Sequence, residues 1–113
     1  MNIKSHSPNS AEIISEKVVI TELEDALQLL GDIYYQGFDK LILHAHHFCP
    51  QFYDLRTGLA GEIIQKFVQY RMGLRIVGDF TTYQSKSLQA FMFESNKGKH
   101  LRFVTSVEEA LRT

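Results

Sequence analysis

Two short apolar runs separated by a helical repeat constrain the fold of this chain more than any other feature of the sequence. The first run is Lys40–Ala45 and the second is Leu74–Phe80. Between them, apolar residues recur at helical spacing, namely Leu59, Ile63, Phe67 and Tyr70. Short apolar runs are typical of buried strands, and three- and four-residue spacing is typical of a helix. The segment therefore predicts a strand–loop–helix–strand unit in which the two strands are parallel.

The remaining segments continue this alternation of strands and helices. Three further strands are predicted, over Ile3–His6, Glu12–Ile20 and Leu101–Val104. Further helices are predicted from Thr21, from Ser85 to Asn96, and from Ser106 to Leu111. Thr21 and Ser106 each precede a glutamate by three residues, which is the capping-box pattern of a helix start. Gly37 and Gly73 stand where two of the helices should end.

This order of elements, ββαβαβαβα, predicts a single α/β domain over residues 1–113. Strands that alternate with helices form mostly parallel sheets with right-handed crossovers. A turn cluster at Pro8-Asn9-Ser10 joins the first two strands, which should therefore form an antiparallel pair at one edge of the sheet. The sequence indicates no linker and no second domain.

Charge and composition exclude several classes of function. Twelve basic against thirteen acidic residues give a formal net charge of −1, and no basic stripe is present, so we expect no nucleic-acid partner. No apolar run approaches the ~20 residues that a membrane-spanning helix needs, so we expect no membrane partner. Cys49 is the only cysteine, which excludes an intramolecular disulfide and favours a reducing compartment. We therefore expect a cytoplasmic protein.

The loop before the helix at Leu59 holds the most varied polar side chains of the chain. Functional groups of α/β sheets gather at the carboxyl ends of the strands, where this loop should lie. The candidate residues for a ligand or phosphoacceptor loop are Asp54, Arg56, Thr57, Gly58, Gly61 and, at the end of the next strand, Asp79. Arg56 offers a forked set of donors and the helix start offers free N–H groups, so the loop suits an anion.

A purely structural role is the alternative for the same residues. Asp54 or Thr57 would then cap the helix, because helix caps are the usual position of such side chains. Gly61 would pack against the sheet, and Asp79 would close the turn after its strand. The sequence leaves both interpretations open.

A second group of candidates follows the strand at Lys40–Ala45. His44 and His46 should alternate onto one face of that strand, and His47 and Cys49 follow it. Imidazole and thiolate groups bind zinc, and an aspartate of the neighbouring loops could complete such a site. However, the ligand spacing of known zinc motifs is missing, and strand histidines often bond a backbone carbonyl instead. Cys49 is typical of a buried side chain, and a Cys/His nucleophile would lack an orienting residue. We expect no cofactor.

Several strings in the second half of the chain resemble a small bacterial family, domain of unknown function 4180. They are Asp-Leu-x-Thr-Gly-Leu-Ala-Gly-Glu, Gln-Lys-Phe, Tyr-Arg, Val-Gly-Asp-Phe and Glu-Ser-Asn-Lys-Gly. The resemblance covers nearly the whole chain and implies no established activity.

The order of elements also resembles the STAS-like fold of anti-sigma-factor antagonists. Thr57-Gly58-Leu59 falls where those domains carry their Thr-Gly-Leu string, and Val107–Leu111 looks like their closing helix. The resemblance implies that a partner kinase phosphorylates the loop at the helix start. Arg56 occupies the position of the phosphorylated serine, so Thr57 would be the acceptor here.

Together these features predict a non-enzymatic regulatory or protein-interaction module of a bacterial cytoplasm, with a protein partner. Tyr70, Phe93 and the edge strand near Ile3 would add a homodimer contact. Two alternatives stay open. The first is a small metal-dependent or Cys/His enzyme that uses the segment His44–Cys49, and the second is a small-anion binder at the loop Arg56–Gly61.

Overall fold

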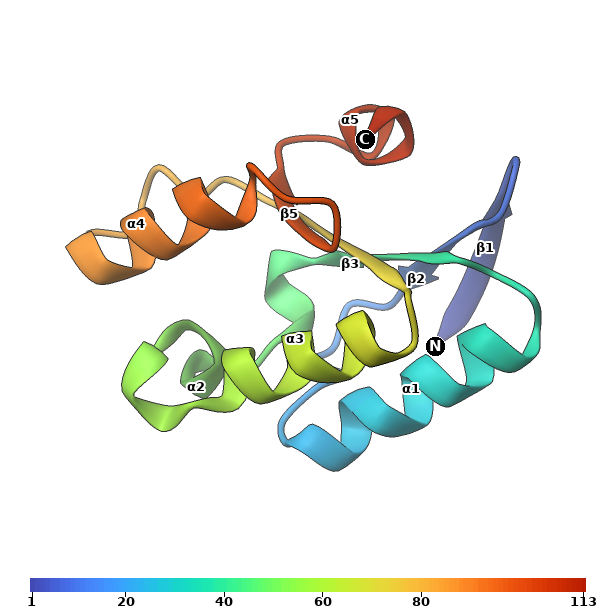
Figure 1. Cartoon of the computed structure of the whole chain (residues 1–113), viewed down its shortest axis with the longest axis horizontal. Coiled ribbons are helices and arrows are strands. Elements are labelled where there is room, and N and C mark those ends of the chain that lie inside the picture. The colour runs from blue at the N-terminus through green and yellow to red at the C-terminus, as the bar shows by residue number, and fades with distance from the viewer.

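A five-stranded sheet forms the centre of the computed structural model, which describes residues 1–113 (Figure 1). The strands are Asn2–His6 (β1), Ser10–Ile14 (β2), Lys40–His44 (β3), Gly73–Val77 (β4) and Leu101–Val104 (β5). They lie across the sheet in the order in which they occur in the chain. β1 pairs antiparallel with β2, and all other neighbouring strands are parallel. The predicted α/β class and its antiparallel N-terminal pair are therefore confirmed.

Helices connect the parallel strands and follow the last one. They are Leu23–Tyr35 (α1), Pro50–Tyr53 (α2), Leu59–Gln69 (α3), Lys86–Ser95 (α4) and Val107–Arg112 (α5). Two 3-10 turns, Ala45–His47 and Leu55–Thr57, flank α2. The predicted order ββαβαβαβα is confirmed, with α2 and the two turns as additions inside the loop after β3. No helix has the length and apolar character needed to cross a membrane.

The two faces of the sheet are covered unequally. Every crossover runs in the same direction along the sheet, so right-handed connections place α1, α3 and α4 on one face. Their buried side chains join one core of 21 residues with the strands, with Ile33, Phe67 and Met92 as examples from the three helices. The opposite face carries only α5, whose Ala110 packs on a small cluster of strand residues. In Figure 1, α5 accordingly lies on the opposite side of the sheet from α1 and α3.

The predicted second strand is too long. β2 ends at Ile14, and the chain then leaves the sheet, with Ile20 forming only an isolated bridge to Phe48. The predicted strand Leu74–Phe80 is likewise too long, because β4 ends at Val77 before a turn.

Two helix boundaries also differ from those predicted. The capping box of α1 uses Glu22 and Asp25 instead of Thr21 and Glu24, since the Asp25 carboxylate accepts N–H bonds from Thr21 and Glu22. α3 ends at Gln69, and Gly73 is the first residue of β4.

Candidate functional site

The carboxyl edge of the sheet is built from the segment that follows β3. His44 ends the strand, and the N–H of His44 bonds Nδ1 of His47 at 2.9 Å. This bond closes the 3-10 turn Ala45–His47, so the chain leaves the sheet one residue earlier than predicted. Pro50 then starts α2, where its missing N–H needs no partner. The predicted alternation of His44 and His46 along one strand face is therefore wrong.

His47 is a fully buried, neutral side chain in this turn. Its exposed fraction is 0%, its Nδ1 accepts from His44, and its Nε2 lies 2.9 Å from the carbonyl of Ser15. Both nitrogens are thus used in the neutral tautomer that carries its proton on Nε2. Burial, which disfavours the charged imidazolium, lowers the pKa of His47.

The Glu12 carboxylate forms hydrogen bonds with two further histidines. It lies on the same face of the sheet as α5, in the part that α5 does not cover. Its side chain is 8% exposed and accepts from Nε2 of His6 at 2.9 Å and from Nε2 of His44 at 2.8 Å. Burial of the carboxylate opposes ionisation, but the hydrogen bonds from His44 and His6 outweigh it and hold the pKa of Glu12 below its usual value.

The predicted metal candidates all have partners within the chain. Nε2 of His46 bonds the Ser15 carbonyl at 2.8 Å, next to His47. The Cys49 thiol is buried and faces the carbonyl of Thr21 at 3.5 Å. No three His, Cys, Asp or Glu side chains are placed to hold a metal ion together.

Asp54 and Arg56 form a two-pronged ion pair in the loop before α3. Nε of Arg56 donates to Oδ1 of Asp54 at 3.0 Å, and Nη2 donates to Oδ2 at 2.9 Å. The backbone N–H of Arg56 also bonds Oδ1, so Asp54 caps the 3-10 turn Leu55–Thr57. These bonds hold the pKa of Asp54 below its usual value. The Arg56 side chain remains 90% exposed.

The other residues of the loop shape its backbone. The Thr57 hydroxyl donates to the carbonyl of Gln51 at 2.8 Å and accepts from the N–H of Leu59 at 3.2 Å. Gly58 has a φ of 77°, in the left-handed region that favours glycine. A Cβ on Gly61 would meet no atom within 4 Å, so the expected packing of Gly61 on the sheet is wrong. The face of α3 toward the sheet is formed by Ala60, Ile63 and Phe67. Phosphorylation at Thr57 stays a prediction.

Asp79 closes a turn after β4. Its Oδ1 accepts from the N–H of Thr81 at 3.1 Å and from the Thr81 hydroxyl at 2.6 Å, and these bonds lower the pKa of Asp79. It lines a hollow near Asn96 and Thr105, whereas His46 lines another hollow. Asp79 and the histidine segment therefore belong to different parts of the edge.

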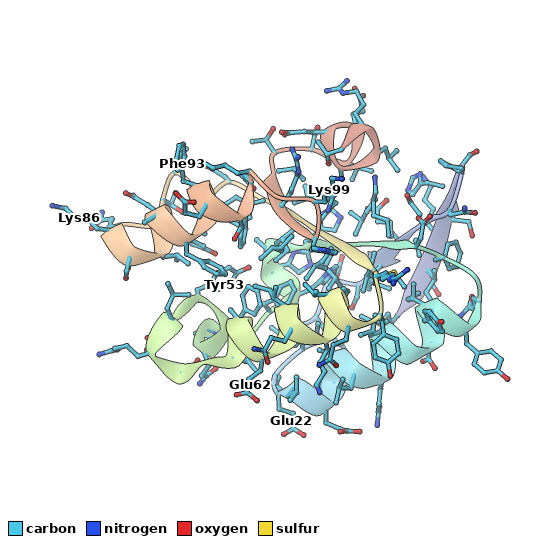
Figure 2. The ribbon with its side chains drawn as sticks, viewed as in Figure 1. Glu22, Tyr53, Glu62, Lys86, Phe93 and Lys99 are labelled. Carbon is cyan, nitrogen blue, oxygen red and sulfur yellow. The ribbon has the colours of Figure 1, made fainter.

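Two adjoining hollows form a trough between the segment after β3 and the start of α4. The aromatic hollow, of about 500 Å³, is lined by Ala45, His46, Phe48, Pro50, Tyr53 and Tyr83. The polar hollow, of about 400 Å³, is lined by Pro50, Tyr53, Asp54, Leu55, Arg56, Ser85 and Ser87. Pro50 and Tyr53 line both, so the two hollows are neighbours. Figure 2 shows Tyr53 between the ribbons of α3 and α4.

Tyr53 is the fixed centre of the trough. Its hydroxyl donates to the carbonyl of Ala45 at 2.8 Å, and its ring meets the Tyr83 ring edge to face, with centroids 5.0 Å apart. Burial raises the pKa of Tyr53 above its usual range. The aromatic side chains of the trough were not among the predicted site residues, although Phe48 and Tyr53 lie beside them in the sequence.

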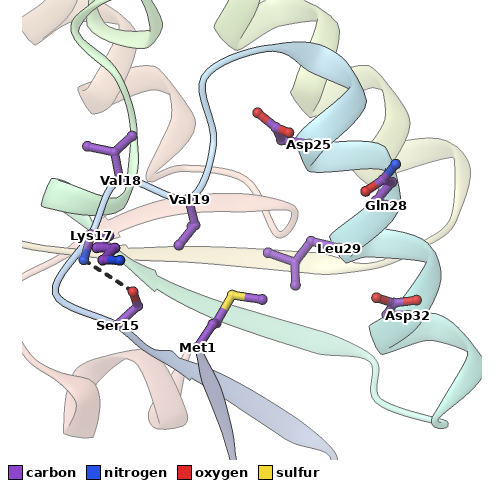
Figure 3. Close-up of a pocket in the computed structure, with 9 residues that line it drawn as sticks. All are labelled: Met1, Ser15, Lys17, Val18, Val19, Asp25, Gln28, Leu29 and Asp32. Atoms are coloured by element: carbon purple, nitrogen blue, oxygen red, sulfur yellow. Dashed lines mark hydrogen bonds between the residues drawn. The ribbon is translucent and has the colours of Figure 1, made fainter.

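A separate hollow of about 350 Å³ lies between α1 and the loop after β2 (Figure 3). Leu29 and Val19 contribute apolar side chains to it, and Asp25 and Asp32 lie on its α1 side. None of the predicted site residues lines this hollow.

A protein-family model described as "Domain of unknown function (DUF4180)" matches residues 5–113 of the chain. No curated protein and no solved structure matches the chain. The resemblance to the STAS-like fold therefore stays a prediction.

Proposed function

The chain belongs to the family described as domain of unknown function DUF4180, and we propose that it is a non-enzymatic regulatory or protein-interaction module of a bacterial cytoplasm. The trough would be its contact site for a partner protein. The observation that carries this proposal is an aromatic hollow of about 500 Å³ at the carboxyl edge of the sheet.

The composition of the trough fits a protein contact. Aromatic side chains are enriched at protein interfaces, because each buries a large apolar area and tyrosine can in addition form a hydrogen bond through its hydroxyl. Tyr53 and Tyr83 present such rings, and Pro50 adds a rigid apolar side chain between the two hollows.

The walls of the trough are also held in place before any partner arrives. Tyr53 is bonded to the Ala45 carbonyl, and His46 is bonded to the Ser15 carbonyl. Side chains that are already ordered lose little conformational entropy on binding, which favours affinity. These bonds support a preformed docking site.

Site-specific photocrosslinking in the native host tests the proposal. A photoreactive phenylalanine analogue at Tyr83 places the probe in the aromatic hollow, and the same analogue at Tyr35, which is 91% exposed on α1, is the matched control. We expect a discrete adduct with another host protein from position 83 only, whereas position 35 can crosslink only to a second copy of this chain. Pro50→Glu, which keeps a residue suited to a helix start, should remove the adduct from position 83. Equal adducts with other host proteins from both positions, or none from position 83, would contradict the proposal.

A further inference from the structure

We propose that protonation of His47 opens the turn Ala45–His47 and with it the aromatic hollow, so that acid releases the partner from the trough. This inference rests on the proposed function and adds the regulation of the same site. Its basis is one imidazole whose neutral form closes the turn, while two residues of that turn, Ala45 and His46, line the hollow.

The neutral form of His47 is part of the turn itself. Its Nδ1 accepts the N–H of His44 at 2.9 Å, and its Nε2 donates to the Ser15 carbonyl at 2.9 Å. A second proton can enter only at Nδ1, where the N–H of His44 already points. Two donors would then face each other, so the bond that closes the turn cannot exist beside a charged His47. Because the ring is fully buried, the charge reaches water only if the ring leaves its site.

Two neighbouring histidines can be protonated without losing a bond. His44 donates from Nε2 to Glu12 at 2.8 Å, and His46 donates from Nε2 to the Ser15 carbonyl at 2.8 Å. Nδ1 of each ring has no partner in the chain and is free to take a proton. A charge on His44 strengthens its bond to the Glu12 carboxylate. Acid therefore breaks the bond at His47 selectively.

The charged groups around His47 keep it neutral at neutral pH. The elements around it carry five titratable side chains, namely His44, His46, Glu12, Glu16 and Lys17. Burial lowers the pKa of His47 most, and charges on the nearby rings of His46 and His44 lower it further. The bond to Ser15 and the charge of Glu12 offset this only in part. The other two side chains are exposed and form no ion pair.

The turn also positions the centre of the trough. The Tyr53 hydroxyl donates to the carbonyl of Ala45 at 2.8 Å, so this ring is fixed to the turn that His47 closes. When the turn opens, Ala45 and His46 leave the wall of the aromatic hollow and Tyr53 loses its acceptor. The docking site is thus complete only while His47 is neutral.

The opening should be confined to the turn. The His47 carbonyl accepts from the N–H groups of Val19 and Ile20 at 2.8 and 2.9 Å, and these bonds do not involve the ring. On the other side of the turn, His44 remains paired with Val77 in the sheet. The chain is therefore held at both ends of the turn, which gives a local element with two states.

Nuclear magnetic resonance of the isolated full chain tests the opening without a partner. We expect the nitrogen shifts of His47 to show a neutral ring with its proton on Nε2 at about pH 7.5. On acidification, the amides of Ala45 and His46 should shift with the midpoint of the His47 ring, while the amide of Ile76 in β4 should not. Because one proton is taken up, the ratio of open to closed turn should rise about tenfold for each pH unit.

Three variants assign the response to its residue. His47→Gln can donate to Ser15 and accept from His44 at every pH, so the turn amides should stop responding. His100→Gln, at an exposed position, is the matched control and should respond as the wild type does. His46→Gln removes a charge beside His47 and should move the opening to higher pH, which tests the inference even if His47→Gln fails to fold.

The photoreactive analogue at Tyr83 links the turn to docking. In a lysate of the native host brought from about pH 7.5 to about pH 5.5, the adduct with a host protein should be lost with the midpoint of the turn amides. In the His47→Gln background the adduct should persist, and in the His100→Gln background it should be lost as in the wild type.

Three results would overturn the inference. They are turn amides that respond equally in His47→Gln, a turn that opens only together with the amide of Ile76, and an adduct that survives the opening of the turn. If the adduct forms equally at both pH values, the docking function stands and its regulation by acid falls. If the turn opens while no adduct forms at any pH, the docking function falls and the inference falls with it.

Discussion

The guanidinium of Arg75 holds Thr113 by two hydrogen bonds, from Nε to the hydroxyl at 2.9 Å and from Nη2 to the carbonyl at 2.8 Å. Arg75 lies on β4 and is only 3% exposed. Its remaining donors reach the carbonyls of Leu74, His100 and Lys99. The buried Arg75 side chain thus joins the residue after α5 to strand β4 and to the two residues that precede β5.

Replacing Arg75 should therefore be among the most damaging substitutions in the chain. Arg75→Met removes all five bonds, four of them to backbone carbonyls, from a side chain that is buried, which should lower the free energy of unfolding by about 3 kcal/mol. Urea denaturation measures this loss. Arg102→Met is the matched control, because Arg102 makes one exposed bond to Gly98, and should cost less than about 1 kcal/mol. A similar loss for both variants would contradict the assigned role.

Stability should fall as the pH is lowered, in two successive windows. The pKa of buried His47 lies below its ordinary value of 6.5, so the unfolded chain protonates His47 at a higher pH than the folded chain does. Stability therefore drops as the pH falls below about 6.5. The pKa of Glu12 lies below its ordinary value of 4.5, so its contribution is present above that pH and is lost as the pH falls through the folded pKa. Urea denaturation at a series of pH values measures both losses.

Two variants assign these windows to their residues. His47→Gln can donate to Ser15 and accept from His44 without titrating, so it should flatten the profile near pH 6.5. Glu12→Gln should instead flatten the acidic end. If neither variant changes the shape of the profile, then other groups cause the pH dependence.

The two glycines at the start of α3 should respond to alanine in opposite directions. Gly61 lies in the helix with open space at its Cβ position, so Gly61→Ala should stabilise the protein by about 0.5–1 kcal/mol through helix propensity. Gly58 has a φ of 77°, so Gly58→Ala should destabilise it by about 1 kcal/mol. Thermal unfolding of both variants measures the difference. If Gly61→Ala destabilises the protein, then Gly61 packs closely against the sheet after all, and the open space at its Cβ position is contradicted.

Local patterns in the sequence were sufficient to predict most of the fold. β5 has the predicted bounds, and α4 starts after Ser85 as expected, because a short apolar run and an N-cap serine are local signals. α2 was missed, since four residues carry no helical period and a Cys-Pro pair is typical of a turn. The end of β3 at His44 was missed because His47, which closes the turn, is fixed by the distant Ser15.

The candidate site depended more on contacts between distant segments. Asp54 and Arg56 are two residues apart, so their hydrogen bonds form within one local turn. The prediction that Asp54 or Thr57 caps α3 is wrong, because Asp54 caps the 3-10 turn Leu55–Thr57 and Gly58 stands at the N-cap of α3 without a side-chain bond. The aromatic hollow could not be derived in this way. Tyr83 reaches Tyr53 from the loop after β4, and only the pairing of β3 with β4 brings the two loops together.

A homodimer contact remains a prediction, and the structure offers a specific surface for it. Tyr34 of α1 and Tyr70 after α3 meet edge to face with centroids 5.4 Å apart. Both are about half exposed, and Tyr35, the next residue after Tyr34, is almost fully exposed. Exposed aromatic clusters of this kind are typical of interfaces. Phe93, which the sequence analysis placed in the same contact as Tyr70, lies on α4, where the Lys97 ammonium is 4.6 Å from the ring centroid. Because α4 lies apart from α1 and from the end of α3 (Figure 1), Phe93 belongs to a different surface from Tyr70.

Light scattering at high micromolar concentration measures the assembly. We expect a mass of twice the 13.0 kDa chain, because apolar rings at this site gain by leaving water on association. Tyr35→Glu adds a charge at a position that supports no core packing, and should shift the protein toward the monomer without lowering its melting temperature. Phe93→Glu is the matched control and should leave the dimer intact. A wild-type chain that scatters only as a 13.0 kDa species would remove the homodimer prediction.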